Sequence, residues 1–98
     1  MADQASIATD ILARYAADAA REVDGVRRVV DRPIPGRRGV RVAGADGSIR
    51  IELHVVADWG ASLPSVGARV QKRVREYLGS MADVEPASVD VVVDAVEE

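Results

Sequence analysis

From Ile49 to Asp58, hydrophobic residues alternate with mostly polar ones. A period of two predicts a β-strand with one buried face. The residues expected on that buried face are Ile49, Ile51, Leu53, Val55 and Ala57, and those expected on the opposite face are Arg50, Glu52, His54, Val56 and Asp58. The alternation stops at Gly60, after which Ser62 is a suitable helix N-cap and Pro64 is tolerated in the first helical turn. The pattern therefore predicts a strand-turn-helix unit.

Two segments have the 3.6-residue period of an amphipathic helix. The first is capped by Ser6 and stops at Asp24-Gly25, and residues 1–5 are expected to be frayed. Its expected buried face is Ile7, Ile11, Leu12, Tyr15, Ala16, Ala19 and Val23. The second follows Ser62 and frays near Gly79, and its expected buried face is Val66, Val70, Val74, Tyr77, Leu78 and Met81.

The remaining segments predict shorter strands and turns. Val26 to Val30 and Val40 to Ala43 have β character, and Asp31 to Gly39 between them is a loop with two prolines and two glycines. Gly44 to Gly47 is a hairpin turn. In the last strand, one face is expected to consist of Val89, Val91, Val93 and Ala95, alternating with Asp90, Val92, Asp94 and Val96.

The order of the predicted elements is α-β-β-β-α-β. Both long strands have one apolar and one mostly polar face, whereas a sheet buried on both sides would be continuously apolar. Both helices should therefore cover the same face of a mixed sheet of three or four strands, which is a two-layer α/β (α+β) sandwich. With 98 residues, the chain is expected to be one domain, residues 1–98, with an ordered core at about 7–96.

Charge is distributed unevenly along the chain, although the net charge is only -3. Between residues 27 and 41 there are six arginines and one acid, and from Asp83 to Glu98 there are six acids and no base. Opposite charges in the middle and at the end either join copies head to tail or form two solvated surfaces. The predicted interaction surface combines these charges with one aromatic residue: Arg27, Arg28, Arg32, Arg37, Arg38, Arg41, Trp59, Asp90 and Asp94.

Catalytic and metal-binding chemistry finds little support. His54 is the only histidine and points outward from a strand, where no pocket holds a nucleophile or partner carboxylate. Asp90 and Asp94 share that face with His54 and Glu52 if the strands are adjacent, but exposed acids without a closed loop make a poor divalent-ion site. The chain has no cysteine, which excludes disulfides and thiol nucleophiles. We predict no enzyme, no metal and no cofactor.

The sequence Gly36-Arg37-Arg38-Gly39 is similar to the G-x-x-G loop of KH-type RNA-binding domains. In KH domains this loop joins two helices, whereas here it lies between two predicted strands. The aromatic residues on which single-stranded nucleic acids stack are also nearly absent. Binding of nucleic acid or an anionic surface by segment 27–41 is therefore the alternative prediction, behind protein contacts.

No apolar run approaches the roughly 20 residues of a membrane-spanning helix. The first residues have neither the basic nor the apolar region of a secretory signal. We expect a cytoplasmic protein that meets a membrane only at its surface or through a partner.

Three blocks of the chain resemble the alkaline-shock family of bacterial envelope stress-response proteins, the general-stress (Gls) type of Gram-positive bacteria. The blocks are the helix 11–26 with its Glu-Val-x-Gly-Val end, the strand 49–60, where the family more often has tyrosine at Trp59, and the segment 62–74 followed by 89–93. The resemblance implies a non-enzymatic cytoplasmic protein linked to envelope or alkaline stress. It also implies that a separate anchor protein holds the chain at the membrane and that the chain self-associates as a homo-oligomer.

Overall fold

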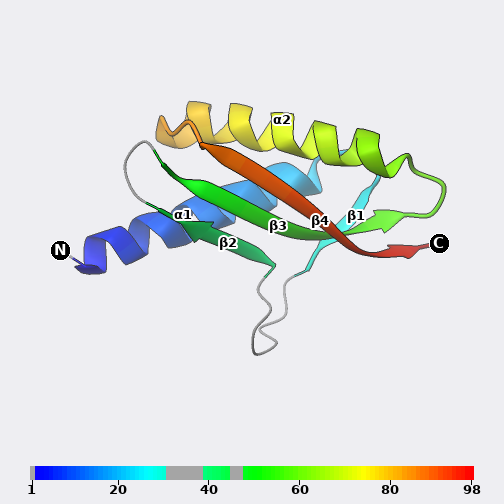
Figure 1. Ribbon diagram of the computed structural model, residues 1–98, viewed down its shortest axis with the longest axis horizontal. Coiled ribbons are helices and arrows are strands. Elements are labelled where there is room, and N and C mark those ends of the chain that lie inside the picture. The colour runs from blue at the N-terminus through cyan, green and yellow to red at the C-terminus, as the bar shows by residue number, and fades with distance from the viewer. Residues whose placement is uncertain (1, 31–38, 45–47) are drawn as a thin grey trace.

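The computed structural model describes residues 2–30, 39–44 and 48–98 of the chain. Its elements are α1 (Ala2–Arg21), β1 (Val26–Val29), β2 (Val40–Ala43), β3 (Arg50–Asp58), α2 (Leu63–Ala82) and β4 (Ser88–Glu97). The predicted order is confirmed, and so is the two-layer α/β architecture, with both helices on one face of a four-stranded mixed sheet (Figure 1).

Strand β3 is the centre of the sheet. Strand β4 pairs parallel with β3 along its whole length, from Arg50 to Asp58. On the other edge of β3, β1 pairs antiparallel with residues 55–57 and β2 with residues 50–53. Strands β1 and β2 therefore lie end to end and act as one interrupted edge strand.

The interruption falls at a single residue of β3. The amide of Val30 donates a hydrogen bond to the carbonyl oxygen of His54, with 2.9 Å between N and O. The amide of His54 in turn donates to the carbonyl oxygen of Gly39, at 2.7 Å. In an uninterrupted antiparallel pair, one residue would make both of these bonds. Here Val30 and Gly39 divide them between the end of β1 and the start of β2.

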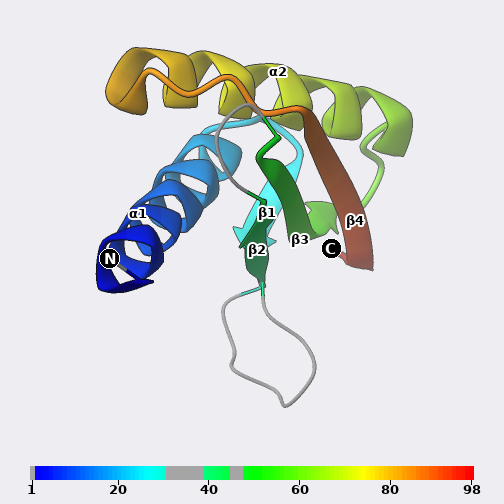
Figure 2. The ribbon, with the colours of Figure 1, turned by 60° about the vertical axis from the view of Figure 1, so that its left-hand side comes forward.

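The core is built from small and β-branched side chains. The predicted buried face of β3 is confirmed by Ile51, Leu53, Val55 and Ala57, each with at most 1% of its surface exposed. From the helices it receives Leu12, Ala16, Ala19, Ala20, Val66, Val70, Val74 and Leu78. Helix α1 contacts β1 and β2, and α2 contacts β4, so the two helices divide one face of the sheet between them (Figure 2).

Gly25 sets the distance between the start of β1 and α2. Its φ of +97° lies in the left-handed region, which favours glycine. A Cβ atom added there would lie 2.6 Å from the Cγ2 atom of Val66, which is closer than such contacts allow. The glycine predicted to stop the first helix thus also allows the chain to pass against α2.

The helices differ from the prediction in three respects. Helix α1 begins at Ala2, so Ser6 lies inside it and is not its cap; the residues before Ser6 include good helix formers. Helix α2 continues past Gly79 to Ala82 and stops at Asp83, which has a φ of 53°. Met81, predicted to be buried, is 50% exposed, because Ala82 and the residues after α2 pack against the core at that end.

The alternation predicted for the last strand is confirmed as far as Val93 and wrong beyond it. Val93 pairs with Val55, but the next residue of β3, Val56, pairs with Ala95. Asp94 is therefore the extra residue of a β-bulge. One added residue reverses the sides of all that follow, so Ala95 comes to the face away from the helices and Val96 to the helix face.

Replacing Leu78, which is fully buried, with alanine should lower the free energy of unfolding by about 2–5 kcal/mol. The truncation leaves a cavity, and the small and β-branched side chains around it cannot extend to fill it. Met81→Ala, one turn later on the same helix and 50% exposed, is the matched control and should change it by less than about 0.5 kcal/mol. Equilibrium urea unfolding measures both. Equal losses for the two variants would contradict the packing described here.

Candidate functional site: the outer face of the sheet

The sheet face away from the helices carries most of the charged residues of the strands. We call it the outer face. The strand register places on it, from β1 and β2, Arg28 and Arg41; from β3, Arg50, Glu52, His54, Val56 and Asp58; and from β4, Asp90, Val92, Ala95 and Glu97. The side chains of Arg27 and Asp94, the two bulge residues, also bond to partners on this face.

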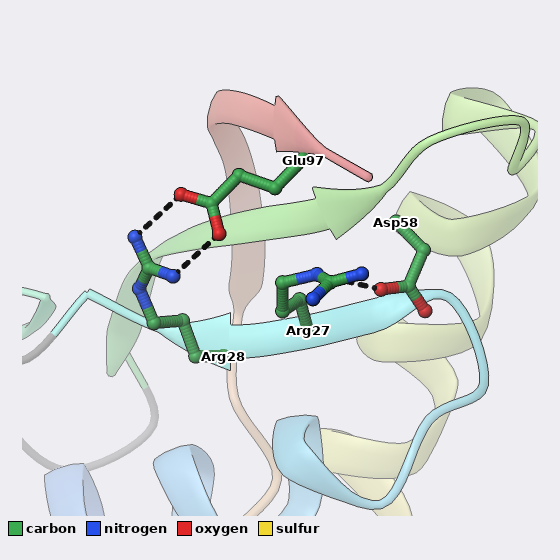
Figure 3. Close-up of polar contacts among 4 residues, drawn as sticks. All are labelled: Arg27, Arg28, Asp58 and Glu97. Atoms are coloured by element: carbon green, nitrogen blue, oxygen red, sulfur yellow. Dashed lines mark hydrogen bonds and ion pairs between the residues drawn. The ribbon is translucent and has the colours of Figure 1, made fainter.

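A bulge in β1 brings two successive arginines to this face. Val26 pairs with Ala57 and Arg28 pairs with Val56, so Arg27 is the extra residue. Both arginines are exposed, whereas a regular strand would have turned one of them into the core. The Nε atom of Arg27 lies 3.1 Å from an Oδ1 atom of Asp58, the last residue of β3 (Figure 3).

Arg28 bridges the full width of the sheet to Glu97 on β4 (Figure 3). Its two terminal nitrogens donate to the two carboxylate oxygens at 2.7 and 2.8 Å, a bidentate pair. The hydrogen bond raises the pKa of Arg28 and lowers the pKa of Glu97. The bridge needs both bulges. Without the bulge at Arg27, Arg28 would face the core, and without the bulge at Asp94, Glu97 would share the helix face with Val93.

Val56 is the outer-face residue that this bridge shields. It is only 3% exposed, although it lies on the face opposite the core. Its neighbours across the ladders are Arg28 on one side and Ala95 on the other. We attribute its burial to the Arg28–Glu97 bridge, because the apolar stem of an arginine covers the surface that it crosses.

His54 is held between two carboxylates. Its Nδ1 atom lies 2.8 Å from an oxygen of Asp94, and its Nε2 atom lies 2.9 Å from an oxygen of Glu52. Two hydrogen bonds to carboxylates require a proton on each ring nitrogen, which is the charged imidazolium. Both hydrogen bonds raise the pKa of His54, and the one to Asp94 contributes more than the one to Glu52. The bulge residue of β4 thus becomes the main partner of the only histidine.

This arrangement is not that of a metal centre. The two carboxylates bond to different nitrogens of one ring, on opposite sides, so they do not converge on a common point. Across residues 2–30, 39–44 and 48–98, no group of three or more His, Cys, Asp or Glu residues is placed to hold a metal ion.

The structure divides the predicted interaction surface into three groups. Arg27, Arg28 and Asp94 have partners within the chain. Arg41 and Asp90 are exposed on the outer face, and Trp59 is 70% exposed at the end of β3. The rest of the predicted surface, Arg32, Arg37 and Arg38, lies outside the described residues.

The alternation of β3 predicts Asp58 and Glu52 on this face but not their bonds, and nothing in the sequence predicts Glu97 there. Glu52 is predicted beside His54, and its bond to the ring could be inferred from the i, i+2 spacing. The partners of Arg27 and Arg28 depend on two bulges, which no local sequence signal marks.

The stability of the protein should fall as the pH rises through the pKa of His54. The folded state raises this pKa above its ordinary value of 6.5, so the bound proton stabilises the fold fully below pH 6.5, and this stabilisation is lost as the pH passes the raised value. His54→Gln should remove that part of the pH dependence. Urea unfolding at a series of pH values measures the effect, and an NMR titration of the ring locates the pKa directly.

Asp90→Asn is the matched control, since Asp90 lies on the same face and neither ring nitrogen of His54 bonds to it. It should leave the pH dependence of wild type in place. A His54 pKa at or below 6.5 would contradict the two hydrogen bonds.

No described helix is long and apolar enough to cross a membrane. Among solved structures, the fold is similar to that of MamM-CTD. Two variants of that domain, one of them a nickel form, each have 17% sequence identity and a TM-score of 0.58, and the matches cover 90% of this chain and 98–99% of theirs. At this identity the likeness concerns the fold alone.

Among curated proteins, the chain is 31% identical over 101 residues to YqhY, an uncharacterized protein of Bacillus subtilis (strain 168), covering 93% of this chain and 75% of that protein. Residues 1–98 match the ASP23 family, which is described as having a cell envelope-related function. The resemblance drawn from the three sequence blocks is thereby confirmed: the chain belongs to the ASP23 (alkaline shock protein) family, whose function is related to the cell envelope.

Proposed function

We propose that this protein is a non-enzymatic adaptor of the envelope stress response. In this proposal it is cytoplasmic, acts through contacts with other proteins and with copies of itself, and is held at the inner face of the membrane by a separate anchor protein. The family's cell envelope-related function supports the setting. The charged and largely uncovered outer face of the sheet supports a role in protein contacts.

One row of residues across the sheet carries the proposal of self-association. Arg41 on β2 pairs in register with Glu52 on β3, and Glu52 pairs in register with Asp90 on β4. The row thus has a basic residue at one edge of the sheet and an acidic residue at the other, and both are exposed. A second copy placed beside the first in the same orientation brings Arg41 of one against Asp90 of the next, which is a head-to-tail contact.

The alternative, binding of nucleic acid or an anionic surface by segment 27–41, is weakened by the ion pairs of the outer face. Arg27 and Arg28 already bond to Asp58 and Glu97. A phosphate would have to displace those carboxylates before it gained either arginine. We therefore propose protein contacts ahead of this alternative.

The head-to-tail contact should appear in sedimentation velocity as species whose mass grows with concentration at low salt. At about 1 M salt, where the Debye length is about 3 Å, they should dissociate. Arg41→Glu and Asp90→Arg should each weaken the association. The double variant should restore it, because the charges then exchange places at both edges.

Arg14→Glu is the matched control, since it reverses an exposed arginine on α1, which lies on the opposite face of the sheet from the row (Figure 2). It should leave the association unchanged. If wild type is a single species of constant mass at low salt, or if the double variant associates no better than the single ones, this contact is excluded.

A further inference from the structure

Trp59 is the most exposed of the large hydrophobic residues that the structure describes, at 70%. The other two aromatic residues behave differently. Tyr15 and Tyr77 pack edge to face between α1 and α2, with ring centroids 5.7 Å apart. A chain with only three aromatic side chains therefore leaves the largest of them out of its core. Tryptophan is the residue type most enriched at the energetic centres of protein interfaces.

The backbone at Trp59 is fixed. Its amide donates to the carbonyl oxygen of Glu97 at 2.7 Å, which ties it to the end of β4. The next turn closes with a bond of 3.2 Å from the amide of Ala61 to the carbonyl oxygen of Asp58. Gly60 has a φ of +87°, which glycine adopts without strain. A side chain on so well anchored a turn loses little backbone freedom when it binds.

Two further apolar side chains are exposed at the same end of the molecule. Val96, 39% exposed, pairs in register with Ala57, two residues before Trp59. Leu63, also 39% exposed, begins α2 directly after the turn. The end of β3, the end of β4 and the start of α2 lie together in the fold (Figure 1). We call Trp59, Leu63 and Val96 the apolar end.

Two of the three acids that flank the apolar end in the sequence are neutralised within the chain, and the third, Glu98, is exposed. Asp58 pairs with Arg27, and Glu97 pairs with Arg28 (Figure 3). This matters for a contact between identical copies related by a two-fold axis, because each surface then meets itself and any net charge meets its like. An apolar patch beside balanced ion pairs is complementary to itself.

The unpaired edge of β4 lacks this property. Pairing it with the same edge of a second copy would set Asp90 and Asp94 against the same acids. The start of that edge is also occupied from within the chain. Gln71 and Arg75 of α2 donate to the carbonyl oxygens of Val89 and Pro86, at 2.9 and 2.8 Å.

We propose that the apolar end is a two-fold interface between two copies of this chain, with Trp59 at its centre. The inference rests on the proposed function only in that both describe a protein acting through protein contacts. The surface and the chemistry differ: the head-to-tail contact is charged and joins opposite edges of the sheet, whereas this one is apolar and lies at the sheet's end.

Fluorescence of Trp59, the only tryptophan, reports on this interface directly. Purified full-length protein is diluted over roughly three decades of concentration at about 1 M salt, where charged contacts are screened and apolar ones persist. We expect the emission to shift to shorter wavelength with rising concentration, and the sedimentation mass to double over the same range.

Trp59→Ser should raise the dimer dissociation constant by roughly tenfold or more, as for a residue at an interface centre. Leu63→Ser should raise it by a smaller factor. Met81→Ser, at an exposed apolar position near the other end of α2, is the matched control and should leave it unchanged within about twofold. Far-UV circular dichroism confirms that each variant is folded.

The outcomes separate the two proposals. Association that disappears in high salt, with unshifted emission, overturns this interface and leaves the head-to-tail contact standing. A monomer under every condition overturns both. Dimerisation in high salt that survives Trp59→Ser, or an emission shift that occurs only when anionic lipid vesicles are added, overturns the assignment of the apolar end to a second copy.

Discussion

Pairing along both edges of β3 is the constraint on which the rest of the fold depends. The buried side of this strand supplies the centre of the core, and its other side supplies Glu52, His54 and Asp58 to the outer face. Because the sheet has only one covered face, every partner strand must match the parity of β3. The core has no phenylalanine and no buried tryptophan, so alanines on α1 and valines on α2 bring both helices close to the strand.

Two single-residue bulges then decide which charges meet. At Arg27 and at Asp94, one extra residue in the partner strand reverses which of its later side chains face outward. The first bulge turns two arginines outward, and the second turns Glu97 outward and makes Asp94 a partner of His54. The ion pairs of the outer face therefore depend on the positions of the bulges as much as on the identities of the charged residues.

The contrast between these two levels explains what the sequence could predict. Strand β3 and helix α2 could be predicted because the environment of their side chains repeats at a fixed interval. The ion pairs could not be predicted from the sequence. Asp94-Ala95-Val96 is compatible with either set of residues facing outward, and no local signal marks an extra residue there. Segment 27–41 looked like a free basic surface for the same reason: the partners of Arg27 and Arg28 lie 31 and 69 residues away along the chain.

The division of one pairing position between Val30 and Gly39 has a consequence for His54. Both backbone groups of His54 have a partner where β1 ends and β2 begins, because its carbonyl oxygen accepts from Val30 and its amide donates to Gly39. Its ring is held separately by the carboxylates of Asp94 and Glu52. The charged imidazole is thus anchored at its backbone and at both ring nitrogens, in the middle of the central strand.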